Sequence, residues 1–408
     1  MTDINETPMP EEFTRLWSSV KFVKHPKLEV RQSPVGVEIT NFATGIQAIF
    51  ADKAPLDLLD GFAAPQTMAQ ISGGCPDLSM GGLGQALIAF LELTFLLPEL
   101  VMRDTPCPCC SESEFKQKSS IPDPRFLTDF NFVECALCGA TYLHPMPDTD
   151  VMHFYYLCLG HYRTRRTHAQ KGYLSGVKEI GEQRKLGVIK DVFPSLNGIK
   201  LLDVGCGDGS FLAQMAFHGA FAVGNEVDTF ELERIKSGSP NIDVIPGQFV
   251  QANFSQTCEL DLITFWSYFE HEEQQITALR RSRQLLKTGG VLIIELPDIG
   301  GRLAKIAASE WPFYDPPFHI IHHNKESLTK LLSKEGFQVI RWYPYGSSPS
   351  ILKYSPLLLL LMCKLKLAYD SERIDRLVML VSSLSRPIED RMGLSGKMII
   401  VAKKAETR

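Results

Sequence analysis

The 408-residue sequence lacks a run of basic residues, and its formal net charge is −5. Proteins that bind a nucleic-acid backbone or an anionic membrane through charge need such a run, so both kinds of partner are disfavoured. Long hydrophobic runs are also missing. The longest, PLLLLLM at residues 356–362, is far shorter than the roughly 20 residues that span a bilayer. We therefore expect no nucleic-acid partner and no stable membrane insertion.

A secretion signal, internal repeats and low-complexity tracts are absent as well. The first residues, MTDINETPMPEEF, are acidic and contain proline, without the basic start and apolar core of a signal peptide, so we expect a cytoplasmic protein. Ten cysteines in a reducing compartment are not expected to form a disulfide framework, which makes clustered cysteines candidates for metal binding. The length exceeds what one core usually serves, and two or three domains are expected.

What the sequence does contain is a glycine-rich turn within LLDVGCGDGSFL, residues 201–212. An apolar run precedes the turn and apolar residues follow it at helical spacing, which predicts a strand, a turn and a helix of a parallel sheet. Ligands bind above the sheet at such turns. The dinucleotide pattern G-x-G-x-x-G is not matched, because Ser210 stands where its last glycine belongs.

Acidic residues surround this turn. Asp203 and Asp208 would repel a pyrophosphate and suit a cationic or amino-bearing ligand, and S-adenosylmethionine carries both a sulfonium and an amino group. Glu226 follows about twenty residues later, at the end of the next predicted strand, where a carboxylate can accept both hydroxyls of a ribose. A tight connection without a ligand is the alternative, and it leaves Glu226 unexplained.

The turn and the motifs after it resemble the class I S-adenosylmethionine-dependent methyltransferases. LLDVGCGDGSFL followed by VGNEVD resembles the first motif and the acidic motif of that family, and ELDLITFWSYFEHEEQ resembles its fourth-strand motif. LRRSRQLLKTGGVLIIELPD, SLTKLLSKEGFQVIRWYP and SGKMIIVAKK follow in the family's order, the last as an antiparallel terminal strand. The resemblance implies an α/β fold with a Rossmann-like, doubly wound, mostly parallel seven-stranded sheet over residues 161–408.

The resemblance also implies S-adenosylmethionine as cofactor, together with the residues that bind it. Asp203 would support its amino group directly or through water, and Glu226 would hold its ribose. The family's usual acidic residue near the adenine amine is missing, so Gln248 and the backbone of Phe249 would recognise the adenine. The implied cofactor-binding residues are Asp203, Gly205, Cys206, Gly207, Gly209, Glu226, Gln248 and Phe249.

Two C-x-x-C pairs, Cys107 with Cys110 and Cys135 with Cys138, predict a tetrahedral zinc site made of four thiolates. A closed site of this kind is structural and not catalytic. Four unpaired core thiols are the alternative. With the following GATYLHPMPD, residues 101–160 resemble the zinc-ribbon lead-in of natural-product and sugar methyltransferases, where it helps to wall the acceptor pocket.

Two histidine motifs compete for the role of a catalytic base, which is needed only if the methyl acceptor must lose a proton. His271 follows Glu270 in the fourth-strand motif, and His319 lies in WPFYDPPFHIIHHNKESL. A structural role is the alternative for each. Sugar C-methyltransferases have a glutamate just before the equivalent of His319 and a tyrosine two positions earlier. Phe318 and Pro316 stand at these positions, which disfavours carbanion chemistry on a keto-sugar.

No catalytic metal is expected at the fourth-strand motif. Ubiquinone-type O-methyltransferases resemble this motif but place further acidic residues around it for a metal, where this sequence has Ser267 and Gln274. His322 and His323 are expected to be structural or exposed.

Residues 1–100 predict a small winged-helix-like accessory domain. Alternating apolar residues around Val37, the strand-like IQAIF and a helical pattern over residues 83–95 give its expected elements. Together with LLDGFAAPQTM they resemble PqqD-like domains, which bind the leader peptides of ribosomally made natural products by adding the peptide as a strand. The alternative is a structural or dimerising cap.

The sequence therefore predicts an S-adenosylmethionine-dependent methyltransferase with a structural zinc ion, acting on a natural-product acceptor that is a peptide or a small metabolite. Methylation of a nucleotide-linked sugar at carbon or oxygen is one alternative. A non-catalytic scaffold that keeps the methyltransferase fold is another, and the intact DVGCGDG with Glu226 argues against it.

Overall fold

The computed structural model describes residues 21–24, 28–33, 36–41, 46–50, 59–60, 63, 66–67, 70, 96–98, 100–123, 128–148, 151–152, 173–238, 242–255, 259–311, 313–345 and 396–405. The chain divides into two compact units. The first comprises Met1–Asp104, Pro122–Phe130 and Pro145–Ala169, and the second comprises Thr105–Ile121, Asn131–His144 and Gln170–Arg408.

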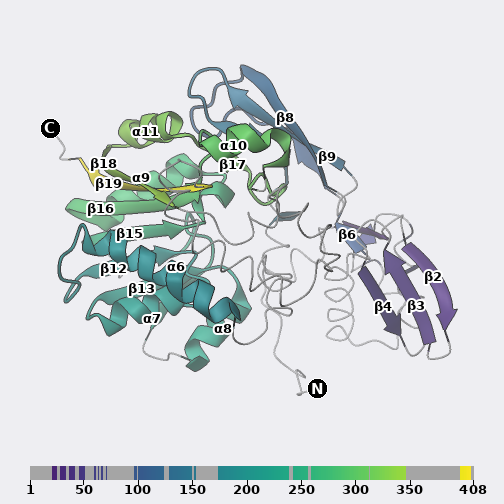
Figure 1. Ribbon diagram of the computed structural model, residues 1–408, viewed down its shortest axis with the longest axis horizontal. Coiled ribbons are helices and arrows are strands. Elements are labelled where there is room, and N and C mark those ends of the chain that lie inside the picture. The colour runs from purple at the N-terminus through teal and green to yellow at the C-terminus, as the bar shows by residue number, and fades with distance from the viewer. Residues whose placement is uncertain are drawn as a thin grey trace, which may run out of the picture. The chain divides into compact units, whose positions relative to one another are not determined.

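A seven-stranded sheet forms the centre of the second unit (Figure 1). Its order across the sheet is β14 (Asp243–Pro246), β13 (Phe221–Glu226), β12 (Lys200–Val204), β15 (Leu260–Trp266), β16 (Leu286–Pro297), β19 (Lys397–Lys404) and β18 (Phe337–Tyr345). The first five strands are parallel, while β19 runs antiparallel to both of its neighbours. This arrangement confirms the predicted Rossmann-like sheet and its antiparallel terminal strand.

Helices connect and cover these strands. They are α6 (Tyr173–Lys190), α7 (Ser210–Phe217), α8 (Thr229–Gly238), α9 (Gln275–Leu285), α10 (Arg302–Ala307) and α11 (Lys325–Lys334), with two short 3-10 helices, η1 (Phe269–His271) and η2 (Ala308–Glu310). Both α7 and α8 pack against β13, α9 packs against β16, and α11 packs against β18 (Figure 1). Asn324 caps α11, because its side chain accepts a hydrogen bond from the Ser327 N–H.

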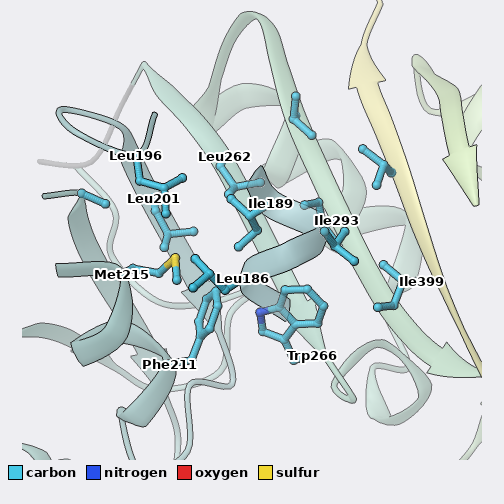
Figure 2. Close-up of a cluster of buried hydrophobic side chains, with 14 residues drawn as sticks. Leu186, Ile189, Leu196, Leu201, Phe211, Met215, Leu262, Trp266, Ile293 and Ile399 are labelled. Atoms are coloured by element: carbon cyan, nitrogen blue, oxygen red, sulfur yellow. The ribbon is translucent and has the colours of Figure 1, made fainter. Parts of the chain in front are cut away.

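The core explains why the central strands are apolar throughout. Every residue of β15 is buried, and alternate side chains face opposite sides of the sheet. On one side, Trp266 packs edge-on against Phe211, while on the other Phe265 contacts the rings of Phe249 and Phe269. The first side is also filled by side chains from α6, α7 and four strands, among them Leu186, Ile189, Met215, Leu201, Leu262, Ile293 and Ile399 (Figure 2).

The cysteine pairs belong to a separate four-stranded sheet with the order β17 (Ile321–His322), β10 (Thr141–Leu143), β9 (Thr128–Cys135) and β8 (Phe115–Asp123). The strand β17 lies in sequence between β16 and α11, and it pairs antiparallel with β10. The sheet that holds the cysteines is therefore completed by a strand from elsewhere in the chain.

Short antiparallel strands make up most of the described part of the first unit. One sheet joins β2 (Leu28–Ser33), β3 (Gly36–Asn41) and β4 (Ile46–Phe50), and a second joins β5 (Gln66–Thr67), β1 (Lys21–Lys24) and β6 (Leu96–Pro98). A third pairs β7 (Met102–Arg103) with β11 (Met146–Pro147). The strands expected around Val37 and at IQAIF are β3 and β4.

The helix expected over 83–95 and the apolar run at 356–362 lie outside the described residues, and the segment LLDGFAAPQTM lies partly outside them. Within the described ranges, no helix is both long enough and apolar enough to cross a membrane.

Candidate functional site

The glycine turn follows β12 and leads into α7, as the sequence predicts. Gly205, Gly207 and Gly209 have φ values of 68°, 55° and 72°, in the left-handed region where only glycine is unstrained. A Cβ atom on Gly205 would also lie 2.6 Å from Cδ2 of Tyr268. Backbone conformation and a close neighbour together therefore require glycine at this position.

Cys206, between two of these glycines, points into the core. Its side chain is buried with Leu212 and Ile235, and a Cβ atom on Gly224 of β13 would meet its Sγ at 2.6 Å. Only the backbone of Cys206 can therefore face a ligand at the turn.

Glu226, the last residue of β13, lies beside the glycine turn. Its Oε2 accepts a hydrogen bond of 2.8 Å from the Gly207 N–H, and its Oε1 accepts from the N–H groups of Val227 at 2.8 Å and Asp228 at 2.9 Å. Burial raises the pKa of Glu226, although these three N–H groups oppose the shift. The carboxylate is thus fixed in place, and its further lone pairs can accept hydroxyl groups.

Asp203 in β12 is only 2% exposed, and its Oδ1 accepts a hydrogen bond of 2.6 Å from the hydroxyl of Thr264. Burial raises its pKa to about 7, opposed by Lys185 and Thr264. The Lys185 ammonium lies 5.3 Å from the centroid of the Trp266 ring and 5.4 Å from that of Phe211. The sequence interpretation missed Lys185, because nothing in its helical pattern sets it apart from a surface lysine.

Gln248 and Phe249 follow β14, the strand beside Glu226. The Phe249 ring is fully buried and packs edge-on against Phe254 and Phe265, so only its backbone can contact a ligand. The backbone N–H of Gly247 donates to the carbonyl of Glu226 at 2.9 Å. This hydrogen bond holds the loop close to Glu226, the residue expected to bind the ribose.

Tyr268 covers the glycine turn from the end of β15. Its hydroxyl donates to Oε2 of Glu272 at 3.0 Å, and burial raises its pKa well above the usual value. Neighbouring Ser267 has a positive φ of 53° and donates to Oε1 of Glu295 at 2.8 Å. The Lys397 ammonium donates to both Ser267 at 2.6 Å and Glu295 at 2.9 Å.

This network keeps Glu295 ionised. Burial acts to raise the pKa of Glu295, but Lys397 and Lys185 outweigh it and the net shift is downward. The ion pair between the partly buried Lys397 and the buried Glu295 joins β19 to β16, and the hydrogen bonds of Ser267 add the carboxyl end of β15.

The two candidate bases, His271 and His319, come from different loops but lie together. Their ring centroids are 4.7 Å apart, and one ligand atom from each lies within 4.8 Å of a carboxylate oxygen of Glu270. Nδ1 of His271 bonds to the carbonyl of Phe318 at 2.8 Å, and Nδ1 of His319 bonds to that of Phe313 at 2.7 Å. The backbone N–H of residue 320 donates to the carbonyl of Glu270 at 3.0 Å, which ties the two loops together.

The sulfur atoms of Cys107, Cys110, Cys135 and Cys138 all lie within 4.8 Å of one another. The distances Cys107–Cys138 and Cys110–Cys135 are both 3.5 Å. Zinc bound to four thiolates has Zn–S bonds of about 2.3 Å, which places the sulfurs roughly 3.7 Å apart, so the four residues fit this metal.

Cys109 lies between the two cysteines of the first pair but belongs to neither pair, and it is buried with neighbours of its own. Its Sγ lies 3.4 Å from Oε1 of Gln275 and 3.9 Å from Nε2 of His323. Both His322 and His323 are fully buried, and burial lowers the pKa of each, to about 4 for His323. These two histidines are therefore neutral and structural, and neither is exposed.

A cavity of about 710 Å³ lies between β8 of the cysteine sheet, α10 and the start of β19. Five basic and two acidic side chains line it, so its charge is positive within an acidic chain. Ser119 from β8 and Tyr314 meet in its wall, with their hydroxyls 2.8 Å apart. The cysteine sheet therefore contributes to the wall of this cavity.

Comparison with known proteins agrees with the fold. Residues 168–341 match the family model of a methyltransferase domain. A probable S-adenosylmethionine-dependent methyltransferase of Mycolicibacterium smegmatis is 24% identical over 142 residues, which cover 35% of this chain and 53% of that protein. A ubiquinone biosynthesis O-methyltransferase of Glaesserella parasuis is 29% identical over 118 residues, covering 27% of this chain and 50% of that protein.

Among solved structures, the chain is similar to magnesium protoporphyrin IX methyltransferase of Synechocystis, which has S-adenosylhomocysteine bound. The TM-score is 0.41 and the identity is 15%, and the match covers 63% of this chain and all of that one. The chain spans about half the length of the curated relatives it matches. Residues 168–341 are therefore similar to a methyltransferase domain, and the seven-stranded sheet has an α/β Rossmann-like fold.

Proposed function

We propose that this chain transfers a methyl group from S-adenosylmethionine to a natural-product acceptor, either a peptide or a small metabolite. The observation that supports this most is the fixed position of Glu226. Its carboxylate lies 2.8 Å from the Gly207 N–H, so an acceptor of ribose hydroxyls stands directly beside a turn built for close approach of a ligand.

The remaining cofactor contacts follow from the same geometry. The backbone at Gly205, Gly207 and Gly209 would face the methionyl part of S-adenosylmethionine. Asp203, in the strand that leads into the turn, would attract the amino group of this cofactor. The buried Phe249 ring leaves Gln248 and backbone atoms for the adenine. Tyr268, above Gly205, is an addition to the predicted set.

Methyl transfer breaks the bond between the methyl carbon and sulfur, sulfur keeps the electron pair, and the acceptor atom forms the new bond. Most of the catalysis comes from holding the three atoms in line. Where the acceptor must lose a proton, His271 and His319 are the groups able to take it. Their Nδ1 atoms donate to carbonyls, so the lone pair of each neutral ring lies on Nε2.

We further propose that Cys107, Cys110, Cys135 and Cys138 hold a structural zinc ion. The 3.5 Å sulfur distances and the two C-x-x-C pairs support this assignment. Such a metal would stabilise the sheet that supplies Ser119 to the cavity.

The first unit is the candidate partner-binding module. In the described part of the β2–β3–β4 sheet, the outer strands are β2 and β4, and a leader peptide could add to such an edge as a further strand. Binding of a precursor peptide there would make the acceptor a peptide.

A nucleotide-linked sugar is the second candidate acceptor, and the positive charge of the 710 Å³ cavity favours it. If this is the acceptor, a nucleoside diphosphate should bind to the protein saturated with S-adenosylhomocysteine. The affinity should fall with added salt, as expected for charge attraction in a partly open site. Absence of binding by the uridine, guanosine, adenosine, cytidine and thymidine diphosphates alike would leave the peptide or metabolite as the acceptor.

Calorimetric binding of S-adenosylhomocysteine tests the proposed cofactor site. The wild-type protein should bind it, and Glu226→Ala should weaken binding by roughly 100-fold, because two hydrogen bonds to a charged group are lost. Asp243→Asn is the matched control, since it removes an exposed carboxylate from the neighbouring strand β14. A folded wild-type protein that does not bind the ligand would make the chain a scaffold.

A further inference from the structure

An ion pair on the helix α6 has no part in the cofactor contacts described above. Lys185 donates a hydrogen bond of 3.1 Å to Oε1 of Glu182, one helical turn earlier. Ile189, one turn later on the same face of the helix, is fully buried in the cluster that packs against the sheet (Figure 2). The side chains of Lys185 and Glu182 are only 17% and 15% exposed, so the pair is turned toward the sheet.

The part of the sheet beside this pair carries polar groups. Asp203 of β12 accepts a hydrogen bond from Thr264 of β15, and Trp266 lies two residues further along β15 on the same face. The Lys185 ammonium lies 5.3 Å from the centroid of the Trp266 ring and 5.4 Å from that of Phe211, at the start of α7. The ion pair therefore lies near the carboxyl ends of β12 and β15, where the glycine turn begins.

Two buried polar atoms of this group have no hydrogen-bond partner among the residues that the structure describes. One is an acceptor, Oε2 of Glu182, and the other is a donor, Nε1 of Trp266. In Figure 2 the nitrogen of the Trp266 ring is on the edge that faces Phe211, and the Lys185 ammonium is about equally far from both rings. Buried polar atoms without a partner are uncommon and usually mark the place of a water or a ligand.

The chemistry of these atoms matches the end of an α-amino acid, whose ammonium donates hydrogen bonds and whose carboxylate accepts them. S-adenosylmethionine ends in such a group. Because Asp203, Asp208 and Glu226 make the surroundings of the turn acidic, the ligand's carboxylate needs a cation beside it. The Lys185 ammonium has three N–H donors, and Glu182 takes one of them.

We propose that Lys185 and Trp266 bind the α-carboxylate of S-adenosylmethionine, and that Glu182 joins Asp203 in accepting hydrogen bonds from its amino group. This assignment rests on the proposed function and adds the helix α6 to the cofactor site. It also gives the site a specificity, because a ligand without the carboxylate would leave the Lys185 and Trp266 donors unpaired.

Decarboxylated S-adenosylhomocysteine tests the assignment, because it keeps the amino group and lacks only the carboxylate. In calorimetry on the full-length protein, the wild type should bind S-adenosylhomocysteine at least about tenfold more tightly than the decarboxylated ligand, since a charge-assisted contact is lost. Lys185→Met keeps the apolar stem of the side chain and removes its charge. This variant should bind S-adenosylhomocysteine at least about tenfold more weakly than the wild type does, without weaker binding of the decarboxylated ligand.

Lys190→Met is the matched control, because Lys190 is exposed in the last turn of the same helix, and it should bind both ligands as the wild type does. Trp266→Phe removes the indole N–H and should reduce the preference for the ligand with the carboxylate. Binding of the decarboxylated ligand reports that each variant is folded.

Two results would overturn this assignment and leave the proposed function standing. One is equal binding of the two ligands by the wild-type protein, and the other is equal weakening of both by Lys185→Met. A folded wild-type protein that binds neither ligand would overturn the proposed cofactor site together with this assignment.

Discussion

At the scale of single residues, the two carboxylates of the proposed cofactor site have different surroundings. Three backbone N–H groups hold Glu226, so its charge is compensated by the fold itself. Asp203 has one neutral hydroxyl partner, and burial raises its pKa to about 7. A buried group with few partners is the one that a charged ligand affects most.

We therefore expect the affinity for S-adenosylhomocysteine to depend on pH through Asp203. Below pH 7 the Asp203 carboxyl is mostly protonated in the free protein, and the ligand's ammonium favours the ionised form. Binding then releases a proton, so the affinity should rise with pH by up to about tenfold per unit and become constant above about pH 7 to 8. Calorimetry at several pH values between about 5.5 and 8.5, on both sides of the Asp203 pKa, measures this dependence of the affinity.

Asp203→Asn is the control for this experiment. The amide keeps the size of the side chain and removes its titration, while Glu226 and the N–H groups around it stay in place. The variant should bind more weakly at high pH and lose most of the slope. An unchanged slope would mean that Asp203 does not contact the amino group.

At the scale of elements, a buried chain of side chains links the cysteine sheet to η1. Nε2 of Gln275 donates to the carbonyl of Phe269 at 2.7 Å, and its Oε1 lies 2.8 Å from Nε2 of His323 and 3.4 Å from Sγ of Cys109. Ser327, at the start of α11, lies 3.1 Å from Nδ1 of His323. Gln275 thus fixes the short helix that presents Glu270 and His271.

Replacing Gln275 with leucine should destabilise the protein by roughly 2–4 kcal/mol, since several buried polar groups lose their partner at once. Urea unfolding measures the change. Gln274→Leu is the matched control, because Gln274 is the exposed neighbour and should change the free energy of unfolding by no more than about 0.5 kcal/mol. Equal effects of the two substitutions would show that the buried chain contributes nothing.

The elements themselves were largely predictable. The run of apolar residues in LLDV, the glycines after it and the helical spacing that follows identify β12, the turn and α7, because each depends on neighbouring residues only. β17 was not predictable. It has two residues, and its pairing with β10 joins positions that are far apart in the chain.

At the scale of the whole molecule, the second unit contains two sheets that share a segment. The residues between β16 and α11 provide β17 to the cysteine sheet as well as Tyr314 and His319. A metal that holds the cysteine sheet would therefore also hold one wall of the cavity, where Ser119 and Tyr314 meet.

Removal of the thiolate metal should consequently affect more than the cysteine segment. Cys138→Ser should contain one zinc ion fewer per chain than the wild-type protein and unfold at a lower temperature, because metal binding contributes directly to folding. Elemental analysis and calorimetric melting measure the two effects. Cys109→Ser keeps all four proposed ligands and should retain the zinc. Equal zinc contents in Cys138→Ser and the wild type would exclude these cysteines as its ligands.

The sequence by itself determined the class of fold, the position of the glycine turn, the acidic residue on the next strand and the two cysteine pairs. Each of these is encoded in residues that are close in the chain, where backbone conformation and spacing leave few choices. Only the tertiary structure determines that Cys206 points into the core and that Asp203 is buried. It also determines that Tyr268 packs against Gly205 and that His319 lies close to Glu270 and His271. Such placements depend on how loops that are distant in the sequence pack at the end of the sheet. Local sequence patterns do not predict side-chain packing between residues that are far apart in the chain.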